Sequence, residues 1–117
     1  MSVPLYEAKA ELFRLLGHPV RIRVLELLQD GPMQVRDLLA AIEVEATGLS
    51  QHLAVLRCSD LVIAHREGST VVYALSCGDV AELLRAARQL LTAKLSAKLS
   101  GERELLSELV QAEAGRQ

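Results

Sequence analysis

Apolar residues recur every three or four positions along the first part of the chain, a spacing that predicts two amphipathic helices. The first helix is expected over residues 4–17. The second is expected to begin at Pro19, with His18 as a candidate cap, and to end at Gly31-Pro32. Each helix has one apolar face, so each needs a packing partner.

Two shorter helices separated by a tight turn are predicted between residues 34 and 58. The second of these helices carries Leu49, Leu53 and Leu56 at helical spacing. One side of that helix should therefore pack against its neighbour, while the opposite side stays free.

The pattern then changes to two β-rich runs within residues 61–75, joined by Glu67-Gly68-Ser69, which predicts a hairpin. A helix, a turn, a second helix and a hairpin are typical of a winged helix-turn-helix, whose second helix enters the major groove of DNA. We predict a mainly α fold with a small β-hairpin, in the order α-α-α-α-β-β-α. Residues 1–117 should form a single domain of this kind.

A long apolar stripe predicts a final helix over residues 79–112. The stripe consists of Val80, Leu83, Leu84, Ala87, Leu90, Leu91, Leu95, Leu99, Leu105, Leu106, Leu109 and Val110. Gly101 leaves open whether the helix continues or breaks, because an interior glycine costs only about 1 kcal/mol. A small domain has too few elements to cover so long a stripe, so we predict that it forms a dimer interface.

The charge balance of the chain argues against DNA binding that depends only on electrostatic attraction to the phosphates. The formal net charge is -2, and residues 30–75 hold three basic side chains against six acidic ones. A DNA-binding surface with this balance must depend on a few specific contacts. The same acidic balance keeps a second hypothesis open, namely a winged-helix protein-interaction module that no longer binds DNA.

Other classes of protein lack their signatures. There is no nucleophile with a base at a sensible spacing, no glycine-rich phosphate loop and no HExxH or paired-carboxylate motif, so we do not expect an enzyme. No apolar run approaches the roughly 20 residues that cross a bilayer, and the N-terminus lacks a secretory pattern. Two cysteines without a framework of spaced pairs suit a reducing compartment. We expect a cytoplasmic protein without a membrane partner, and the sequence assigns it no cofactor.

The predicted helix that carries Leu49, Leu53 and Leu56 is the one expected to enter the major groove, and we call it the recognition helix. Its free face has small, polar side chains. Gln51 is the leading candidate for base recognition, because glutamine can form two hydrogen bonds to adenine. Thr47 and Ser50 can contact bases or phosphates, and Arg57 at the far end of the helix suits a phosphate. An ordinary solvated polar face remains the alternative.

Three further residues are candidates for DNA contacts. Arg66, near the tip of the hairpin, could reach the adjoining backbone or the minor groove. His65 beside it is expected to approach a phosphate or solvent. His52 follows Gln51 and either contacts DNA or faces the second helix.

Three segments together resemble the ArsR/SmtB family of repressors. They are LGHPVRIRVLELL at 16–28, LSQHLAVLR at 49–57 and LVIAHREGSTVVYAL at 61–75, and the resemblance covers about residues 5–90. It implies a homodimer built on the first and last helices, residues 4–17 and 79–112, that binds double-stranded operator DNA. It also implies release from the DNA when an effector binds, and the effector is unknown.

The metal sites familiar from that family lack their residues here. The cysteine pair that many arsenic and cadmium sensors carry on the third helix is absent from Met33–Leu38. Of the zinc-sensor set on the last helix only Asp79 is present, and the other matching positions are Ala81, Thr92 and Leu95. Three scattered histidines do not make a metal site by spacing. A weaker alternative is a site near the N-terminus built from Glu7, Glu11 and His18.

The two cysteines have two interpretations. Cys77 precedes the last helix, where a thiol can have a lowered pKa, and Cys58 ends the recognition helix, so either could act as a redox or persulfide sensor. We favour the alternative that both are small, semi-buried packing residues. For His18 we likewise favour a structural role, as the cap of the second helix, over a ligand role.

Overall fold

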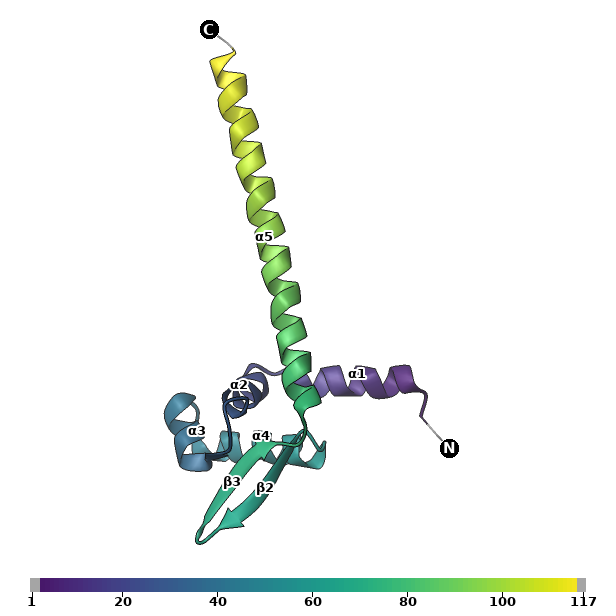
Figure 1. Ribbon diagram of the computed structural model, residues 1–117, viewed down its shortest axis with the longest axis vertical. Coiled ribbons are helices and arrows are strands. Elements are labelled where there is room, and N and C mark those ends of the chain that lie inside the picture. Colours follow the sequence, from purple (N-terminus) through teal and green to yellow (C-terminus); the bar gives the residue numbers. More distant parts are fainter. Residues whose placement is uncertain (1–2, 116–117) are drawn as a thin grey trace. The chain divides into compact units, whose positions relative to one another are not determined.

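The computed structural model describes residues 3–115, whose elements are shown in Figure 1. The five helices are α1 (Leu5–Leu16), α2 (Pro19–Leu28), α3 (Val35–Ala41), α4 (Ala46–Cys58) and α5 (Gly78–Ala114). The three strands are β1 (Met33–Gln34), β2 (Val62–Glu67) and β3 (Thr70–Leu75). Two compact units are distinguished, one ending at Glu82 and the other beginning at Leu83. The first unit holds every element except most of α5.

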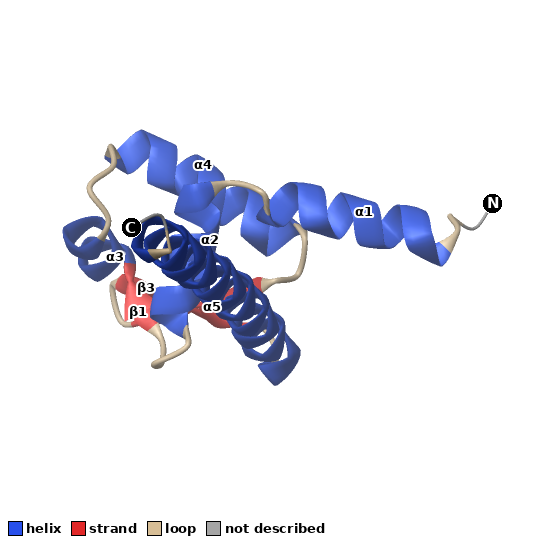
Figure 2. Ribbon diagram, turned by 90° about the horizontal axis from the view of Figure 1, so that it is seen from above, coloured by secondary structure: helices blue, strands red, loops and turns tan. Residues whose placement is uncertain are grey.

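The core of the first unit is aliphatic, because the chain has only two tyrosines, one phenylalanine and no tryptophan. Its largest fully buried side chains are Leu25, Leu38, Leu49, Leu53, Leu56, Val24 and Val62. Helix α2 contacts both α1 and α4 (Figure 2). Helix α4 also contacts β2. The three leucines predicted to anchor the recognition helix are therefore confirmed as core residues. They hold α4 against α2 and β2, and not chiefly against the preceding helix α3, which the sequence had favoured as their packing partner.

The N-terminal signal of α2 is also confirmed. Pro19 occupies its first turn, where its missing N–H has no intrahelical partner to lose. His18 is the N-cap, and its Nδ1 accepts a hydrogen bond of 3.2 Å from the backbone N–H of Val20. This contact satisfies one of the donors that the first turn of a helix leaves unpaired.

The sheet has one strand more than predicted. Its order is β1-β3-β2, and the predicted hairpin of β2 and β3 pairs Val62 with Leu75 and Glu67 with Thr70. Strand β1 lies on the other side of β3, with Met33 opposite Tyr73. The predicted element order was incomplete at this point. A strand of two residues is too short to show alternation, so only its pairing with β3 defines it.

The hairpin turns at Gly68, which has a φ of +64°. A left-handed residue at this first loop position suits the type II′ turn, whose twist matches that of the strands, and glycine adopts it without strain. Gly48 in α4, by contrast, has helical geometry, and no atom lies within 4 Å of where its Cβ would be.

This contrast predicts opposite effects of the same substitution. Gly68→Ala should lower the free energy of unfolding by about 1–2 kcal/mol, because an L-residue is strained at positive φ. Gly48→Ala should raise it by about 0.5–1 kcal/mol, because alanine loses less backbone freedom in a helix. Thermal and urea unfolding followed by circular dichroism would measure both. Equal effects of the two variants would contradict the turn geometry.

Helix α5 runs without a break through Gly101, which resolves the alternative that the sequence left open. Beyond its first turns the apolar stripe is exposed in the single chain. Leu90, Leu91, Leu95 and Leu99 are 49–66% exposed, and Leu105, Leu106, Leu109 and Val110 are 57–66% exposed. None of the helices within residues 3–115 is long and apolar enough to span a membrane.

Candidate nucleic-acid interface

Helix α4 separates its buried and exposed faces sharply. Leu49, Leu53 and Leu56 are at most 1% exposed, since they recur at intervals of four and three and so fall on one side of the helix. The opposite side carries exposed side chains, namely Thr47, Ser50, Gln51, Ala54 and Arg57. Four of the residues expected to contact DNA thus share one solvent-facing surface. Their hydrogen-bonding groups suit the edges and phosphates of a major groove.

His52 lies on a different side of α4 from those residues. It is half-buried, and its Nδ1 accepts a hydrogen bond of 3.1 Å from Nε of Arg21 on α2. Its ring lies 4.1 Å, centroid to centroid, from that of His18. Of the two alternatives left open for this residue, the structure supports the one that faces the second helix.

The hairpin of β2 and β3, which forms the wing, places a histidine beside a carboxylate. His65 and Arg66 are both exposed on β2, but Nε2 of His65 lies 3.0 Å from Oε1 of Glu67. A carboxylate beside His65 weakens its attraction to a phosphate. Arg66 makes no ion pair within the part of the chain that the structure describes, so it is the better placed of the two for a DNA backbone.

A hollow of about 420 Å³ opens beside the exposed face of α4. It is lined by Ser50, Ala54, Arg57, Cys58 and Tyr73. The sequence did not single out Tyr73, because the strand pattern around it gave no indication that it would border the recognition helix. The hydroxyl groups of Ser50 and Tyr73 and the guanidinium of Arg57 could donate hydrogen bonds to a phosphate here.

Both cysteines are exposed and free, so the expectation that they are semi-buried packing residues is wrong. Cys58 is the last residue of α4. Cys77 precedes α5, and its Sγ lies 4.0 Å from Oγ of Ser76. The two thiols are not bonded to each other.

Two of the three residues of the weaker metal alternative, His18 and Glu11, have other partners, and Glu7 is exposed. Nδ1 of His18 caps α2, and Glu11 forms a hydrogen-bonded ion pair with Arg14. The Arg14 guanidinium holds the pKa of the Glu11 carboxyl below its usual value. Within residues 3–115 no three histidine, cysteine, aspartate or glutamate side chains are grouped as a metal ion requires.

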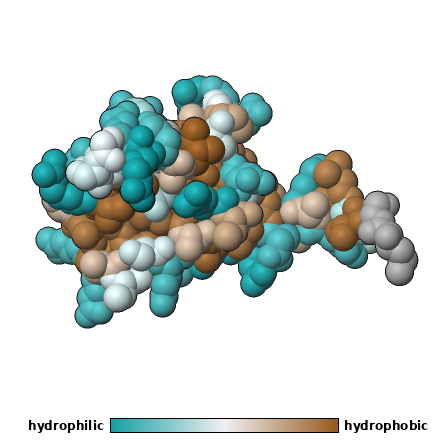
Figure 3. All heavy atoms as spheres, turned by 90° about the horizontal axis from the view of Figure 1, so that it is seen from below, coloured by the Kyte–Doolittle hydropathy of each residue, from teal (hydrophilic) through white to brown (hydrophobic). Residues whose placement is uncertain are grey.

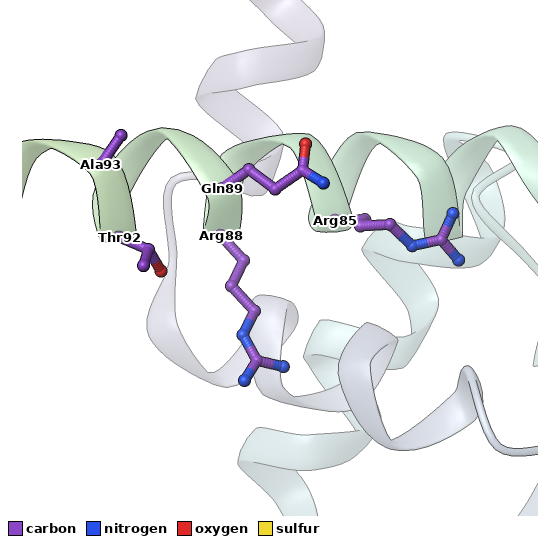
Figure 4. A pocket seen from close by; sticks show the side chains of 5 residues that line it. All are labelled: Arg85, Arg88, Gln89, Thr92 and Ala93. Carbon is purple, nitrogen blue, oxygen red and sulfur yellow. The ribbon is translucent and has the colours of Figure 1, made fainter.

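A second hollow, of about 560 Å³, lies on α5. Its lining residues are Arg85, Arg88, Gln89, Thr92 and Ala93, and all of them project from this one helix (Figure 4). A site for a small molecule usually buries most of its ligand between several elements. We therefore assign no ligand to this hollow.

Comparison with known proteins decides the family. The profile of the bacterial regulatory proteins of the arsR family matches residues 18–64, from the cap of α2 into β2. The HTH-type transcriptional regulator Rv0081 of Mycobacterium tuberculosis is 44% identical over 100 residues, which are 85% of this chain and 88% of that protein. The chain belongs to the arsR family of bacterial regulatory proteins.

Solved structures of ArsR-type regulators share this fold. The crystal structure of Rv0081 superposes with a TM-score of 0.78 and covers 84% of this chain and 99% of its own. The repressor BigR of Xylella fastidiosa is 32% identical, with a TM-score of 0.68 over 73% of this chain and 87% of BigR. A homodimeric winged helix-turn-helix DNA-binding domain, Mb0332 of Mycobacterium bovis, is 28% identical, with a TM-score of 0.71 over 78% and 84% of the two chains.

The predicted fold and the family resemblance are thus confirmed. As a member of the ArsR family, the chain is a DNA-binding transcriptional regulator and not an enzyme. Its partner as a regulator of this family is double-stranded DNA.

Proposed function

We propose that this chain represses transcription by binding a palindromic operator, and that an effector releases it. The observation that supports the proposal best is the exposed polar face of α4, directly opposite its three buried leucines. BigR and SmtB, which are named as repressors, support repression, and HlyU, of comparable identity, is named as an activator. The effector is a metal ion, an oxidant or a small molecule, and the protein works in the cytoplasm.

Thr47, Ser50 and Gln51 are the proposed contacts to the major groove, with Gln51 reading adenine through its amide. Arg57, Ser50 and Tyr73 line one hollow and are the proposed clamp on a phosphate. Arg66 would hold the backbone beside the wing. Because few basic side chains take part, we expect a modest dependence of affinity on salt.

Helices α1 and α5 are the proposed dimer interface. Their exposed apolar side chains include Leu5, Tyr6 and Phe13 on α1 and the leucines from Leu90 onward on α5. In Figure 3 the arm that ends in grey atoms is α1, and apolar side chains are exposed along it. A twofold axis through such an interface would place the two recognition helices about 34 Å apart, one turn of DNA, which predicts the palindrome.

Replacing Gln51 by alanine should reduce the affinity for the operator by about tenfold, because a good bidentate base contact is worth about 1–3 kcal/mol of discrimination. Affinity for random DNA should hardly change. Arg57→Ala should instead weaken binding to operator and random DNA alike. Fluorescence anisotropy with labelled promoter and scrambled duplexes would measure both affinities.

Gln111→Ala and Arg103→Ala are the matched controls, since both replace exposed residues of α5 outside the helix-turn-helix. They should leave both affinities unchanged. If wild type showed no preference for its promoter over random DNA, the proposal would fail. The rival hypothesis of a protein-interaction module would then be favoured.

A further inference from the structure

We propose that His52 is a positioning residue for the recognition helix, and that protonation of its imidazole loosens α4 from α2 and weakens operator binding. The inference rests on the proposed function of α4 as the DNA-reading helix. It assigns a pH-sensitive contact to a residue that does not lie on the DNA-facing surface. The carrying observation is a small polar cluster where α1, α2 and α4 meet.

Arg21 joins the three helices through one guanidinium. Its Nε donates to Nδ1 of His52 on α4, at 3.1 Å, and its Nη1 donates to the backbone carbonyl of Leu15 near the end of α1, at 3.1 Å. The buried side chains of α2 and α4 are aliphatic, and contacts between them have no preferred direction. The Arg21–His52 hydrogen bond is directional, so it restricts the position of α4 along α2.

The hydrogen bond requires a neutral imidazole. A guanidinium only donates, so Nδ1 of His52 must carry a lone pair and the ring proton must be on Nε2. Nδ1 of His18 is also an acceptor, because it receives the N–H of Val20. The two rings lie 4.1 Å apart and are tilted by 47°. A proton added to Nδ1 of His52 would point at Arg21 and place a second positive group beside its guanidinium.

The surroundings oppose that proton. Burial, the charge of His18 and the charge of Arg21, in that order, lower the pKa of His52 from its usual value of 6.5. Of the three carboxylates on α1 and α2, Glu11 pairs with Arg14 and Glu26 with Arg23, and Glu7 is exposed in the first turn of α1. Among the described residues no carboxylate bonds to either imidazole of the cluster.

The sign of the pH effect follows from this depressed pKa. Above pH 6.5 the imidazole is neutral in both the folded and the unfolded chain, and the contact is intact. As the pH falls through 6.5 toward the lower pKa of the folded state, the unfolded chain binds a proton that the folded chain excludes. The free energy of unfolding therefore decreases, and below the folded pKa the Arg21–His52 contact is lost.

The leucine core keeps α4 folded when this contact breaks, so the expected consequence is a less well positioned recognition helix. Because Arg21 also holds the end of α1, the loss should reach a helix of the proposed dimer interface. Coupling of this kind between two sites typically changes affinity by about 5- to 150-fold.

The test measures operator affinity between about pH 7.5 and about pH 5.5, a range that spans histidine titration, at constant ionic strength. The wild-type Kd should rise by about tenfold on acidification. In His52→Gln the amide oxygen can still accept from Arg21 but does not titrate, so the rise should be about twofold or less. His65→Gln removes an exposed histidine of the wing and should retain the wild-type profile.

A second readout is independent of DNA. The midpoint of thermal unfolding should fall more steeply on acidification for wild type than for His52→Gln. His18→Asn should show an intermediate slope, because asparagine preserves the cap and removes one neighbouring charge. If wild type failed to bind its operator even at pH 7.5, the proposed function would be overturned, and the unfolding slopes would still decide the role of His52.

Equal pH profiles of wild type and His52→Gln, in affinity and in unfolding, would overturn the inference. So would a profile abolished by His65→Gln alone. If His52→Gln did not fold, the wild-type chain would provide the test. The pH at which the ring protons of His52 titrate, followed by NMR, should then match the pH at which operator affinity falls, and a mismatch would overturn the inference.

Discussion

Replacing Leu53 by alanine is expected to lower the free energy of unfolding by about 2–5 kcal/mol. The side chain is 1% exposed and lies in the core where α4 packs on α2 and β2. The substitution reduces the apolar surface that is buried on folding. It also leaves a cavity that the neighbouring aliphatic side chains fill only in part. Urea unfolding followed by circular dichroism would measure the change.

Gln51→Ala is the matched control for Leu53→Ala, because it lies two residues away on the exposed face of the same helix. Its effect on the free energy of unfolding should stay within about 0.5 kcal/mol. One variant should thus lose stability and the other operator affinity. Comparable losses of stability in both would contradict the division of α4 into a buried and an exposed face.

Glutamate at both Leu91 and Leu95 is expected to weaken the homodimer by about a hundredfold or more. Both leucines are about two-thirds exposed in the single chain, at 66% and 60%, and lie on the stripe proposed to meet a second copy. Burying two unpaired carboxylates in that contact would cost more than the apolar contact contributes. Sedimentation velocity should show a shift from dimer to monomer, and operator affinity should fall with it.

Ser100→Glu is the control for that variant, since it adds a charge to the same helix about half a turn away from the stripe. It should leave both the dimer and the operator affinity intact. A double Leu91→Glu, Leu95→Glu variant that remained dimeric would exclude this part of α5 from the interface. The interface would then have to be assigned to other surfaces.

For the recognition helix, the sequence was sufficient to predict which side chains are buried and which are exposed. The intervals between Leu49, Leu53 and Leu56 set the buried side of α4, and Thr47, Ser50, Gln51 and Arg57 were assigned to the exposed side by the same count. A period of 3.6 residues belongs to the helix itself, so no tertiary information was needed. The DNA contacts of these residues remain predictions.

His52 shows where that count became ambiguous. It adjoins Gln51 and lies at the border between the two faces of α4. Periodicity therefore allowed either a contact with DNA or a position facing α2. The choice was made by Arg21, which is 31 residues away in sequence and supplies a donor from α2. A contact over such a separation depends on how two helices pack, which no local pattern encodes.

The sequence by itself determined the helices, the hairpin with its glycine turn, the aliphatic core and the family. Each of these depends on local periodicity, turn chemistry or similarity to known chains. Only the tertiary structure decided that β1 pairs with β3, that Tyr73 and Cys58 border the same hollow and that His52 binds Arg21. These features join residues distant in the chain, and they exist because the packing of the leucine core brings their elements together.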